Sequence, residues 1–488
     1  MRCRDLRGYL RLLDERGLLK RIRAPVDLRY EIGAICARSL DRKGPGLLFE
    51  NIRGYEGRPL AANLLSRTEQ LALAFGVEPD DLKVYRAIQE GKSRPVPPVV
   101  VETGPCQEEV HMGEEADVYE FPSPWWHEGD GGQYIATTGG VVTADPRTGA
   151  MNLGMYRAMI KDRRTLTVEI KGSHPVGETP AARDGDRGHT HILENEAGGR
   201  ETRVAIALGM DPLLTYVAGQ AVPSNTLEGG EYGVAGAWHG APVEIVKCRT
   251  SDLLVPARAE TIIEGVIYPG ERMQEGPHGE SQGFYNVCDE AFVIHVTCIT
   301  HRKNPVSYGL ICRPREDYPK FMFSAGLQAR LGEASRLVRE VYVPDAAAAG
   351  HGMMAVVAAR VRSREDVETV ARAVAEAPEE PLICKRPRWL IVVDEDCDVR
   401  DWDDVMWRIG TAVMPHRDLK VGPRIQPSRH EPLAPMYGYK TSTVVIDATF
   451  AGKGGKVEGR EVRFPPINKV SKELQAKIES RWEEYGLD

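Results

Sequence analysis

Two glutamates stand five residues apart around a short segment rich in glycine and proline, Glu275-Gly-Pro-His-Gly-Glu280. Glycine and proline favour turns, so we expect a turn that carries one carboxylate at each end and leaves both outside helices and strands. Paired carboxylates in different environments can be held in different protonation states near neutral pH. The segment therefore indicates general acid–base chemistry, although a solvated surface turn with two unrelated glutamates has the same pattern.

A second segment, Asn152-Leu-Gly-Met-Tyr-Arg157, has the pattern of a β-strand. In a strand, Asn152, Gly154 and Tyr156 point to one face, and Arg157 points to the other. Such a strand offers an amide oxygen to a metal ion and a guanidinium group to an anion. An ordinary edge strand with polar ends is the alternative.

Two further segments carry metal-ligand residue types. The histidines of His189-Thr-His191 would share one face of a strand and reach one metal ion, whereas in a loop they would be solvated. Glu231 is followed by small residues that let a ligand approach the backbone closely, although a surface glutamate is the alternative. Asparagine, histidine and glutamate together suit Mg²⁺ or Mn²⁺ bound to a phosphate.

The composition of the chain narrows the class of protein. The chain has 488 residues, of which 42% are hydrophobic and 27% are charged. This length and composition are typical of a soluble globular protein of two to four domains. A net charge of −8 argues against a broad nucleic-acid-binding surface. No apolar run approaches the ~18 residues that span a bilayer, and we expect no signal peptide. Nine dispersed cysteines without a C-x-x-C pair indicate reduced thiols and a cytoplasmic location.

The elements that must position these residues follow from periodicity, and they indicate a multidomain α/β fold. Helical spacing predicts helices over 5–19, 30–40, 68–75, 364–375, 401–409 and about 469–485. Apolar or alternating runs predict strands at 45–50, 134–142, 203–208, 243–248, 292–300, 353–361 and 389–393. The polar stretch 172–200 predicts a long loop, and the proline-rich stretch 94–98 predicts a linker. The terminal helix is expected to dock on a partner subunit or on its own domain.

Six motifs follow one another along the chain in a specific order. They are Asn152-x-Gly-Met-Tyr-Arg157, Glu231-Tyr, Val255-Pro-Ala-x-Ala-Glu260-x-x-x-Glu264-Gly, Glu275-Gly-Pro-x-Gly-Glu280, Tyr285-Asn286 and Ile391-Val-Val-Asp-Glu-Asp-x-Asp-Val-Arg-Asp-Trp402-Asp-Asp-Val. Together they resemble the UbiD family of reversible decarboxylases, which use prenylated FMN. The resemblance runs from the N-terminal helix to about residue 450.

The resemblance implies a particular domain order. We expect an N-terminal α/β domain over 1–115 and a central split β-barrel domain that binds prenylated FMN over 116–310. A C-terminal α/β domain over 311–455 and a tail with a helix over 456–488 follow.

The resemblance also implies roles for individual residues. Arg157, Glu275 and Glu280 match the catalytic trio, with Glu280 as proton donor and Arg157 and Glu275 as its supporting pair. Asn152 and Glu231 match two of the three ligands that hold Mn²⁺ or Mg²⁺ against the cofactor phosphate.

The remaining cofactor contacts match less cleanly. His191 is the expected third metal ligand, with His189 as the alternative. Met155, Tyr156 and Lys385 complete the expected cofactor-binding set, with Arg388 as the alternative to Lys385, and K⁺ is a further candidate cation.

The implied reaction is the reversible, non-oxidative decarboxylation of an aromatic, heteroaromatic or α,β-unsaturated carboxylic acid, with CO₂ as the small product. The implied partners are a second copy of the chain, in a homodimer or dimer-based oligomer, and a separate UbiX-type flavin prenyltransferase that supplies the cofactor. Neither nucleic acid nor integral membrane association is expected. Trp125, Trp126 and Tyr318 are aromatic candidates for the substrate pocket, with plain packing as the alternative.

Two other functions stay open at this point. The first is a metal-dependent hydrolase that uses His189, His191 and Glu231 around a water molecule. The second is a non-catalytic subunit of a carboxylase complex.

Overall fold

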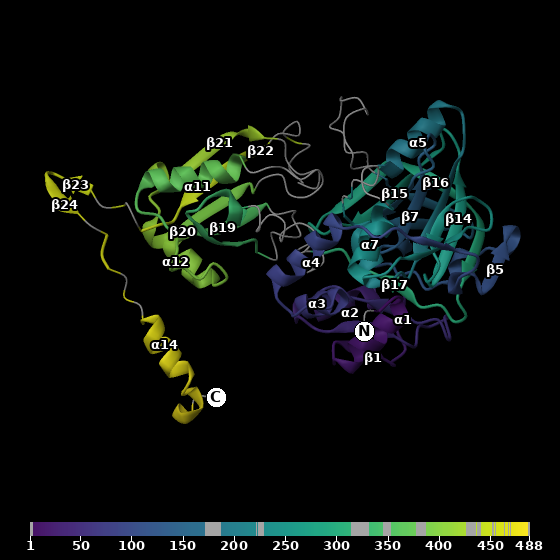
Figure 1. Ribbon diagram of the computed structural model, residues 1–488, viewed down its shortest axis with the longest axis horizontal. Helices are drawn as coiled ribbons and strands as arrows, with labels where there is room; N and C mark the ends of the chain where they lie inside the picture. The colour runs from purple at the N-terminus through teal and green to yellow at the C-terminus, as the bar shows by residue number, and fades with distance from the viewer. Residues whose placement is uncertain are drawn as a thin grey trace.

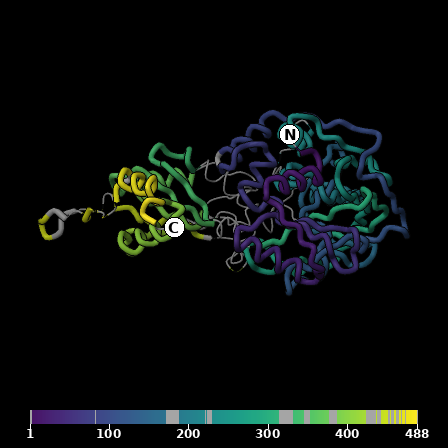
Figure 2. Tube along the Cα trace, turned by 90° about the horizontal axis from the view of Figure 1, so that it is seen from below, coloured from purple at the N-terminus to yellow at the C-terminus, as the bar shows by residue number. Residues whose placement is uncertain are grey.

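The computed structural model describes most of the chain. The described residues are 3–170, 187–220, 222, 229–313, 331–344, 353–376, 387–425, 436, 441–450, 453, 455–462, 464–466, 468 and 470–486. The N-terminal and central elements form one large body, and a smaller C-terminal sheet lies beside it along the long axis in both views (Figures 1 and 2).

Helices dominate the N-terminal part. They are α1 (Leu6–Glu15), α2 (Glu31–Asp41), α3 (Thr68–Phe75) and α4 (Asp81–Ser93). In α1, Leu6, Tyr9 and Leu13 are buried at helical spacing, and Asp5 caps the first turn by accepting a hydrogen bond from Gly8 N. A four-stranded sheet accompanies them, in the order β1 (Leu19–Ile22), β2 (Gly46–Phe49), β3 (Leu60–Ala62) and β17 (Ser307–Gly309).

The central part is built on a ten-stranded antiparallel sheet that curls into a half-barrel (Figure 1). Its strands are β5 (Glu109–Met112), β6 (Tyr134–Ala136), β7 (Gly140–Ala144), β8 (Met151–Met155), β9 (Ala158–Asp162), β10 (Thr165–Val168), β11 (Thr202–Leu208), β14 (Thr261–Ile267), β15 (Arg272–Gly279) and β16 (Tyr285–His301). The long strand β16 pairs with β10, β14, β15 and β5. Residues far apart in sequence therefore meet along this one strand.

Short helices and a small sheet surround the half-barrel. The helices are α5 (Arg187–Ala197), α6 (Pro212–Ala218), α7 (Gly230–His239) and the 3₁₀ turns η1 (Pro105–Gln107), η2 (Gly113–Glu115) and η3 (Val118–Glu120). The small sheet has the order β13 (Leu254–Pro256), β12 (Glu244–Lys247) and β4 (Val99–Val101). Both α5 and α7 pack on β8, which carries the asparagine motif.

The C-terminal sheet is mixed and covered on both faces. Its order is β18 (Val338–Tyr342), β19 (Met354–Ala359), β20 (Trp389–Asp394), β22 (Thr441–Asp447) and β21 (Leu419–Ile425). Alternate residues of β19 pack with α11 (Arg364–Glu376) on one face and with α12 (Trp402–Ala412) on the other. After α13 (Pro415–Asp418) and β22 come a hairpin of β23 (Gly455–Val457) and β24 (Arg460–Val462), then α14 (Lys472–Glu479) and η7 (Trp482–Tyr485).

Two local predictions are wrong. Glu275 to Gly279 do not form an exposed turn but belong to β15, whose irregular pairing with β16 accommodates Gly276 and Pro277. The turn starts at Glu280, whose N–H donates to the carbonyl of Phe284. The predicted loop at 172–200 contains the helix α5 from Arg187 onward, and residues 171–186 lie outside the described residues.

Two strands pair with a sheet on the other side of an expected domain boundary. The domain boundaries themselves stay a prediction. β5 lies before residue 115 but pairs with β16 of the central sheet, and β17 pairs with β3 of the N-terminal sheet. Nearly all of α14 is exposed, so this helix does not pack on its own domain within the described residues. None of the described helices has the length and apolar character needed to cross a bilayer.

Candidate functional site

Arg157 lies between β8 and β9, and its guanidinium group meets carboxylates from a distant part of the chain. Arg157 Nε and Nη2 donate to the two carboxylate oxygens of Glu275 at 2.9 and 2.8 Å, a two-bond contact. Arg157 Nη1 donates to Glu280 Oε1. Glu275 is fully buried, whereas the Glu280 side chain is 17% exposed. The structure thus brings these three residues together and leaves Glu280, rather than Glu275, as the accessible carboxylate.

A third carboxylate completes this cluster, and no sequence motif pointed to its role. Glu169 follows β10 and forms an ion pair with Arg157 Nη2. The side-chain amide of Asn286, on β16, donates to Glu169 Oε2 at 3.3 Å. Asn286 belongs to one of the motifs singled out in the sequence, and its contact with Glu169 gives that motif a physical reason.

One guanidinium group therefore faces three carboxylates. Burial by itself would lower the pKa of Arg157, but the hydrogen bonds of Glu275 and the charges of Glu280, Glu275 and Glu169 outweigh it and raise that pKa. Arg157 stays cationic at every physiological pH. One positive charge and three carboxyl groups therefore meet in a site largely closed to water. A carboxyl group beside a fixed ion pair is an arrangement that acid catalysis can use.

Asp130 and its neighbours hold the strand that carries Glu275. Asp130 Oδ1 accepts from Gly279 N at 2.9 Å, and Asp130 Oδ2 accepts from His127 N at 2.9 Å. Gly131 N donates to the carbonyl of Pro277 at 2.7 Å, and the Tyr134 hydroxyl donates to the same carbonyl at 3.3 Å. These bonds fix the backbone between Glu275 and Glu280.

The close approach of Gly131 to β15 leads to a stability prediction. A Cβ at residue 131 would lie 2.2 Å from the carbonyl oxygen of Gly276, a backbone atom that cannot rotate away. Gly131→Ala should therefore shift β15 and destabilise the protein by about 1–3 kcal/mol. Thermal unfolding followed by circular dichroism measures this change. Gly410→Ala, on α12 with no atom within 4 Å of the added Cβ, is the control, and equal midpoints for the two variants would contradict the prediction.

A second group of predicted residues lies at the other end of β8. Asn152 is buried, and Leu153 N donates to Glu231 Oε2 at 3.3 Å, so Glu231 on α7 reaches the strand. The hydroxyl of Thr143, which pairs with Asn152 across β7 and β8, shares a 2.9 Å hydrogen bond with His191 Nδ1. The asparagine, the glutamate and this histidine are thus held around one short stretch of β8.

The expectation that both histidines share one face is wrong. They lie on the helix α5, where residues two apart point in nearly opposite directions, and not on a strand. His191 is buried against Thr143, whereas the ring of His189 lies 5.8 Å from that of Phe292. The hydrogen bond at Nδ1 fixes the orientation of the His191 ring.

The residues around Asn152 fit a bound metal and phosphate. Asn152 Nδ2 is buried without a hydrogen-bond partner among the described residues, as expected where a group from outside the chain completes the site. An amide oxygen, an imidazole nitrogen and a carboxylate form a donor set for Mn²⁺ or Mg²⁺. The first turn of α5 closes this region, because a Cβ on Gly188 would lie 3.5 Å from Asn152 Nδ2 and 3.4 Å from the Tyr156 hydroxyl.

The remaining predicted residues divide into three groups. Met155 and Tyr156 are half-buried at the end of β8, between the two groups described above. Lys385 and Tyr318 lie outside the described residues. Trp126 is buried in a hydrophobic cluster with Tyr134 and Met159, which is plain packing, and Trp125 packs against Arg29 with 5.7 Å between guanidinium and ring centre.

Three family models match successive parts of the chain. Their descriptions are those of 3-octaprenyl-4-hydroxybenzoate carboxy-lyase: its N-terminal domain matches residues 10–88, its Rift-related domain 99–314, and its C-terminal domain 320–448. An uncharacterized protein of Synechocystis sp. is 30% identical over 523 residues, which cover 99% of this chain and 96% of that protein.

Solved structures match over almost the whole length. Vanillic acid decarboxylase of Sedimentibacter hydroxybenzoicus, in its open form, has a TM-score of 0.77 and 26% identity, covering 99% of this chain and all of that chain. The UbiD-class enzyme HmfF of Pelotomaculum thermopropionicum, in complex with FMN, has a TM-score of 0.77 and 26% identity, covering 96% and 99%. The chain therefore shares the multidomain α/β architecture of these enzymes.

Proposed function

Since the chain belongs to the UbiD family, whose members are carboxy-lyases, we propose that it catalyses the reversible, non-oxidative decarboxylation of an aromatic, heteroaromatic or α,β-unsaturated carboxylic acid. The observation that carries the proposal is the contact of Arg157 with both Glu275 and Glu280. The vanillic acid decarboxylase among the similar structures supports an acid substrate of this class, and HmfF, solved with FMN, supports a flavin.

In the proposed mechanism, Glu280 is the proton donor. Its Oε1 accepts from Arg157, which leaves Oε2 to carry the proton toward the substrate. When bound, prenylated FMN supplies an electron sink for the pair released as the C–CO₂⁻ bond breaks. Glu280 then gives its proton to the carbon that lost CO₂, forming a C–H bond, and regains a proton from solvent through its exposed side. In the carboxylation direction Glu280 removes that proton.

Arg157 and Glu275 support this step through charge and position. The two-bond contact holds the Glu275 carboxylate in place and fixes the plane of the guanidinium group. The guanidinium in turn orients Glu280 and stabilises its carboxylate after proton transfer. Because Glu275 is fully buried, water does not compete for these bonds.

We further propose that Asn152, His191 and Glu231 bind Mn²⁺ or Mg²⁺ against the cofactor phosphate, with K⁺ as a further cation. Met155, Tyr156 and Lys385 complete the cofactor-binding set. The burial of Asn152 and Glu231 and the orientation of His191 by Thr143 support this assignment. The hydrolase alternative needs both histidines on one metal ion, and the helical placement of His189 and His191 does not favour it.

Glu231→Ala should lose the metal and weaken retention of the flavin, because one of three protein ligands and its negative charge disappear. Metal per chain by mass spectrometry and flavin absorbance of the purified variant measure both. Glu115→Ala, at an exposed glutamate in η2, is the control, and circular dichroism checks that each variant is folded. Full metal and flavin in Glu231→Ala would show that the ligand assignment is wrong.

The proposed function is tested by co-expressing the chain with a flavin prenyltransferase. Absorption and mass spectra should reveal prenylated FMN with about one Mn²⁺ per chain, as expected for a site with three protein ligands, and a screen of aromatic and acrylic acids should release CO₂. A colourless protein that is active with metal alone would favour the hydrolase alternative. A flavin-free protein isolated in a stable hetero-complex would favour the non-catalytic subunit.

The remaining proposals concern the setting of the enzyme. We propose a cytoplasmic homodimer or dimer-based oligomer that receives its cofactor from a UbiX-type prenyltransferase. The exposure of Leu474, Trp482 and Tyr485 near the C-terminus supports a contact with a second copy through α14. The eight cysteines within the described residues form no disulfide bond, which supports a reducing compartment.

A further inference from the structure

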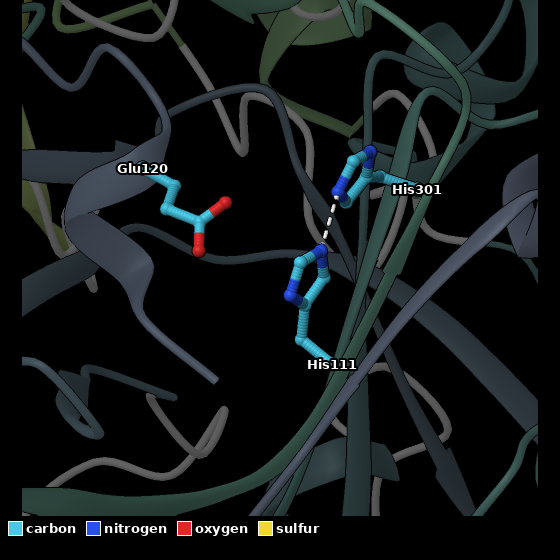
Figure 3. Close-up of side chains that lie close together, drawn as sticks. All are labelled: His111, Glu120 and His301. Atoms are coloured by element: carbon cyan, nitrogen blue, oxygen red, sulfur yellow. Dashed lines mark hydrogen bonds between the residues drawn. The ribbon is translucent and has the colours of Figure 1, made fainter. Parts of the chain in front are cut away.

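Three potential metal ligands lie together on the central sheet, away from the Arg157 cluster. They are His111 on β5, Glu120 at the end of η3 and His301 at the end of β16 (Figure 3). One ligand atom from each residue lies within 4.8 Å of the others, and within the described ranges this is the one such group of His, Cys, Asp and Glu side chains. Nothing in the mechanism proposed above uses these residues.

The sheet itself brings the two histidines together. β5 pairs antiparallel with β16, with His111 opposite Ile299 and His301 opposite Glu109. Ile299 and His301 are two residues apart on one strand, so His301 projects on the same face as His111. His301 lies at the C-terminal end of β16, whereas Cys288, near the other end, pairs with Glu275. The histidine group and the Arg157 cluster are therefore separate sites.

The histidine nitrogens have a spacing that a metal ion can bridge. His111 Nε2 and His301 Nε2 are 3.0 Å apart, and the two rings are stacked with an interplanar angle of 11°. Two nitrogens at about 2.0–2.1 Å from a tetrahedral zinc ion lie roughly 3.3 Å apart, so the nitrogens must separate by about 0.3 Å and the rings must turn until both lone pairs point at the ion. Glu120 points its carboxylate toward the pair in Figure 3.

A backbone contact fixes the ligand nitrogen of His301. His301 Nδ1 lies 2.8 Å from the carbonyl oxygen of Arg302, which can only accept a hydrogen bond, so Nδ1 carries the proton. In the neutral ring Nε2 is then the nitrogen with a lone pair, and it faces His111. Burial lowers the pKa of His301, and the nearby Arg58 and His111 act in the same direction. A histidine held in one tautomer by a backbone carbonyl is the usual support for a metal ligand.

The surroundings of Glu120 are compatible with a ligand role. Arg58 Nη2 donates to Glu120 Oε2 at 3.3 Å, which leaves Oε1 for a metal ion. Phe121, next in the chain, packs its ring edge-on to His301 with 5.5 Å between ring centres. The Glu120 side chain is 33% exposed, so water can reach the fourth coordination position.

We propose that His111, His301 and Glu120 bind a zinc ion, with water as the fourth ligand. Two imidazoles and one carboxylate form a donor set that zinc accepts in tetrahedral geometry. The ion would tie the edge strand β5 and the turn η3 to the end of β16. It would therefore stabilise residues 109–121, which connect the N-terminal part to the segment around Asp130.

The test is zinc binding by the purified holoenzyme and its variants, measured as zinc per chain after equilibrium dialysis and as the thermal shift on adding Zn²⁺. His111→Ala should bind one zinc ion fewer than wild type, and Zn²⁺ should no longer raise its unfolding midpoint. His416→Ala, at an exposed histidine on α13, removes the same residue type elsewhere and should bind as wild type does. Glu231→Ala should keep this zinc ion, which separates the site from the proposed cofactor metal.

Two results would overturn the proposal. In the first, His111→Ala retains as much zinc as His416→Ala, with the same affinity. The contact between His111 and His301 would then be a hydrogen bond and not part of a metal site. In the second, Glu231→Ala loses all zinc binding. If His111→Ala does not fold, Glu120→Gln serves instead, because Glu120 lies on a partly exposed turn, and it should weaken zinc binding at least about tenfold.

Discussion

Glu280→Gln should lower turnover by roughly 10²–10⁴-fold while the protein still binds flavin and metal. The amide keeps the size of the side chain and its hydrogen bond from Arg157 to Oε1, but it has no acidic proton to give to the substrate carbon. Glu280 is also the most accessible of the carboxylates on Arg157, so losing its charge should disturb the fold least. The expected variant is therefore folded, coloured and nearly inactive.

The rate of CO₂ release by Glu280→Gln measures the expected loss of turnover. Its flavin content measures the expected retention of the cofactor. Glu290→Gln, at an exposed glutamate on β16, makes the same chemical change away from Arg157 and should leave both unchanged. Normal turnover in Glu280→Gln would remove Glu280 from the mechanism. Loss of flavin along with activity would indicate instead that Glu280 supports cofactor binding.

The local sequence pattern predicted the strand that carries Asn152. It did not predict the strand that carries Glu275. Residues 151–155 alternate long apolar residues with polar or small ones, and they form β8, whose three central residues are all buried. Residues 275–279 contain two glycines and a proline, which favour a turn by themselves. Pairing with the long strand β16 overrides that preference, and irregular register absorbs the proline. The partner strand pairs through residues 285–292, which lie outside the motif 275–280, so the motif by itself does not reveal the strand.

The residues that the sequence did not reveal share the same physical cause. Glu169 is one polar residue after the strand β10, and only the fold shows that Arg157, just before the paired strand β9, lies beside it. His111 and His301 are separated by 190 positions and meet because β5 pairs with the end of β16. The contact of Arg157 with Glu275 spans 118 positions, and it was expected only through resemblance to a family.

Arg157→Met should destabilise the protein as well as abolish turnover. Methionine fills a similar volume but leaves Glu275, Glu169 and Glu280 without their cation. Removing one partner of a buried ion pair costs about 3–5 kcal/mol, because an uncompensated charge stays in the interior. Catalysis should fail at the same time, because neither Glu275 nor Glu280 keeps its orientation.

Comparison with an exposed arginine tests whether the burial of Arg157 causes the large loss of stability. Arg163 forms an ion pair with Asp117 at 2.8 Å, but its side chain is 66% exposed, so Arg163→Met should cost only about 0–1 kcal/mol. Thermal unfolding midpoints of the two variants and of the wild type measure both losses. Equal losses in the two variants would mean that the carboxylates around Arg157 do not depend on its charge.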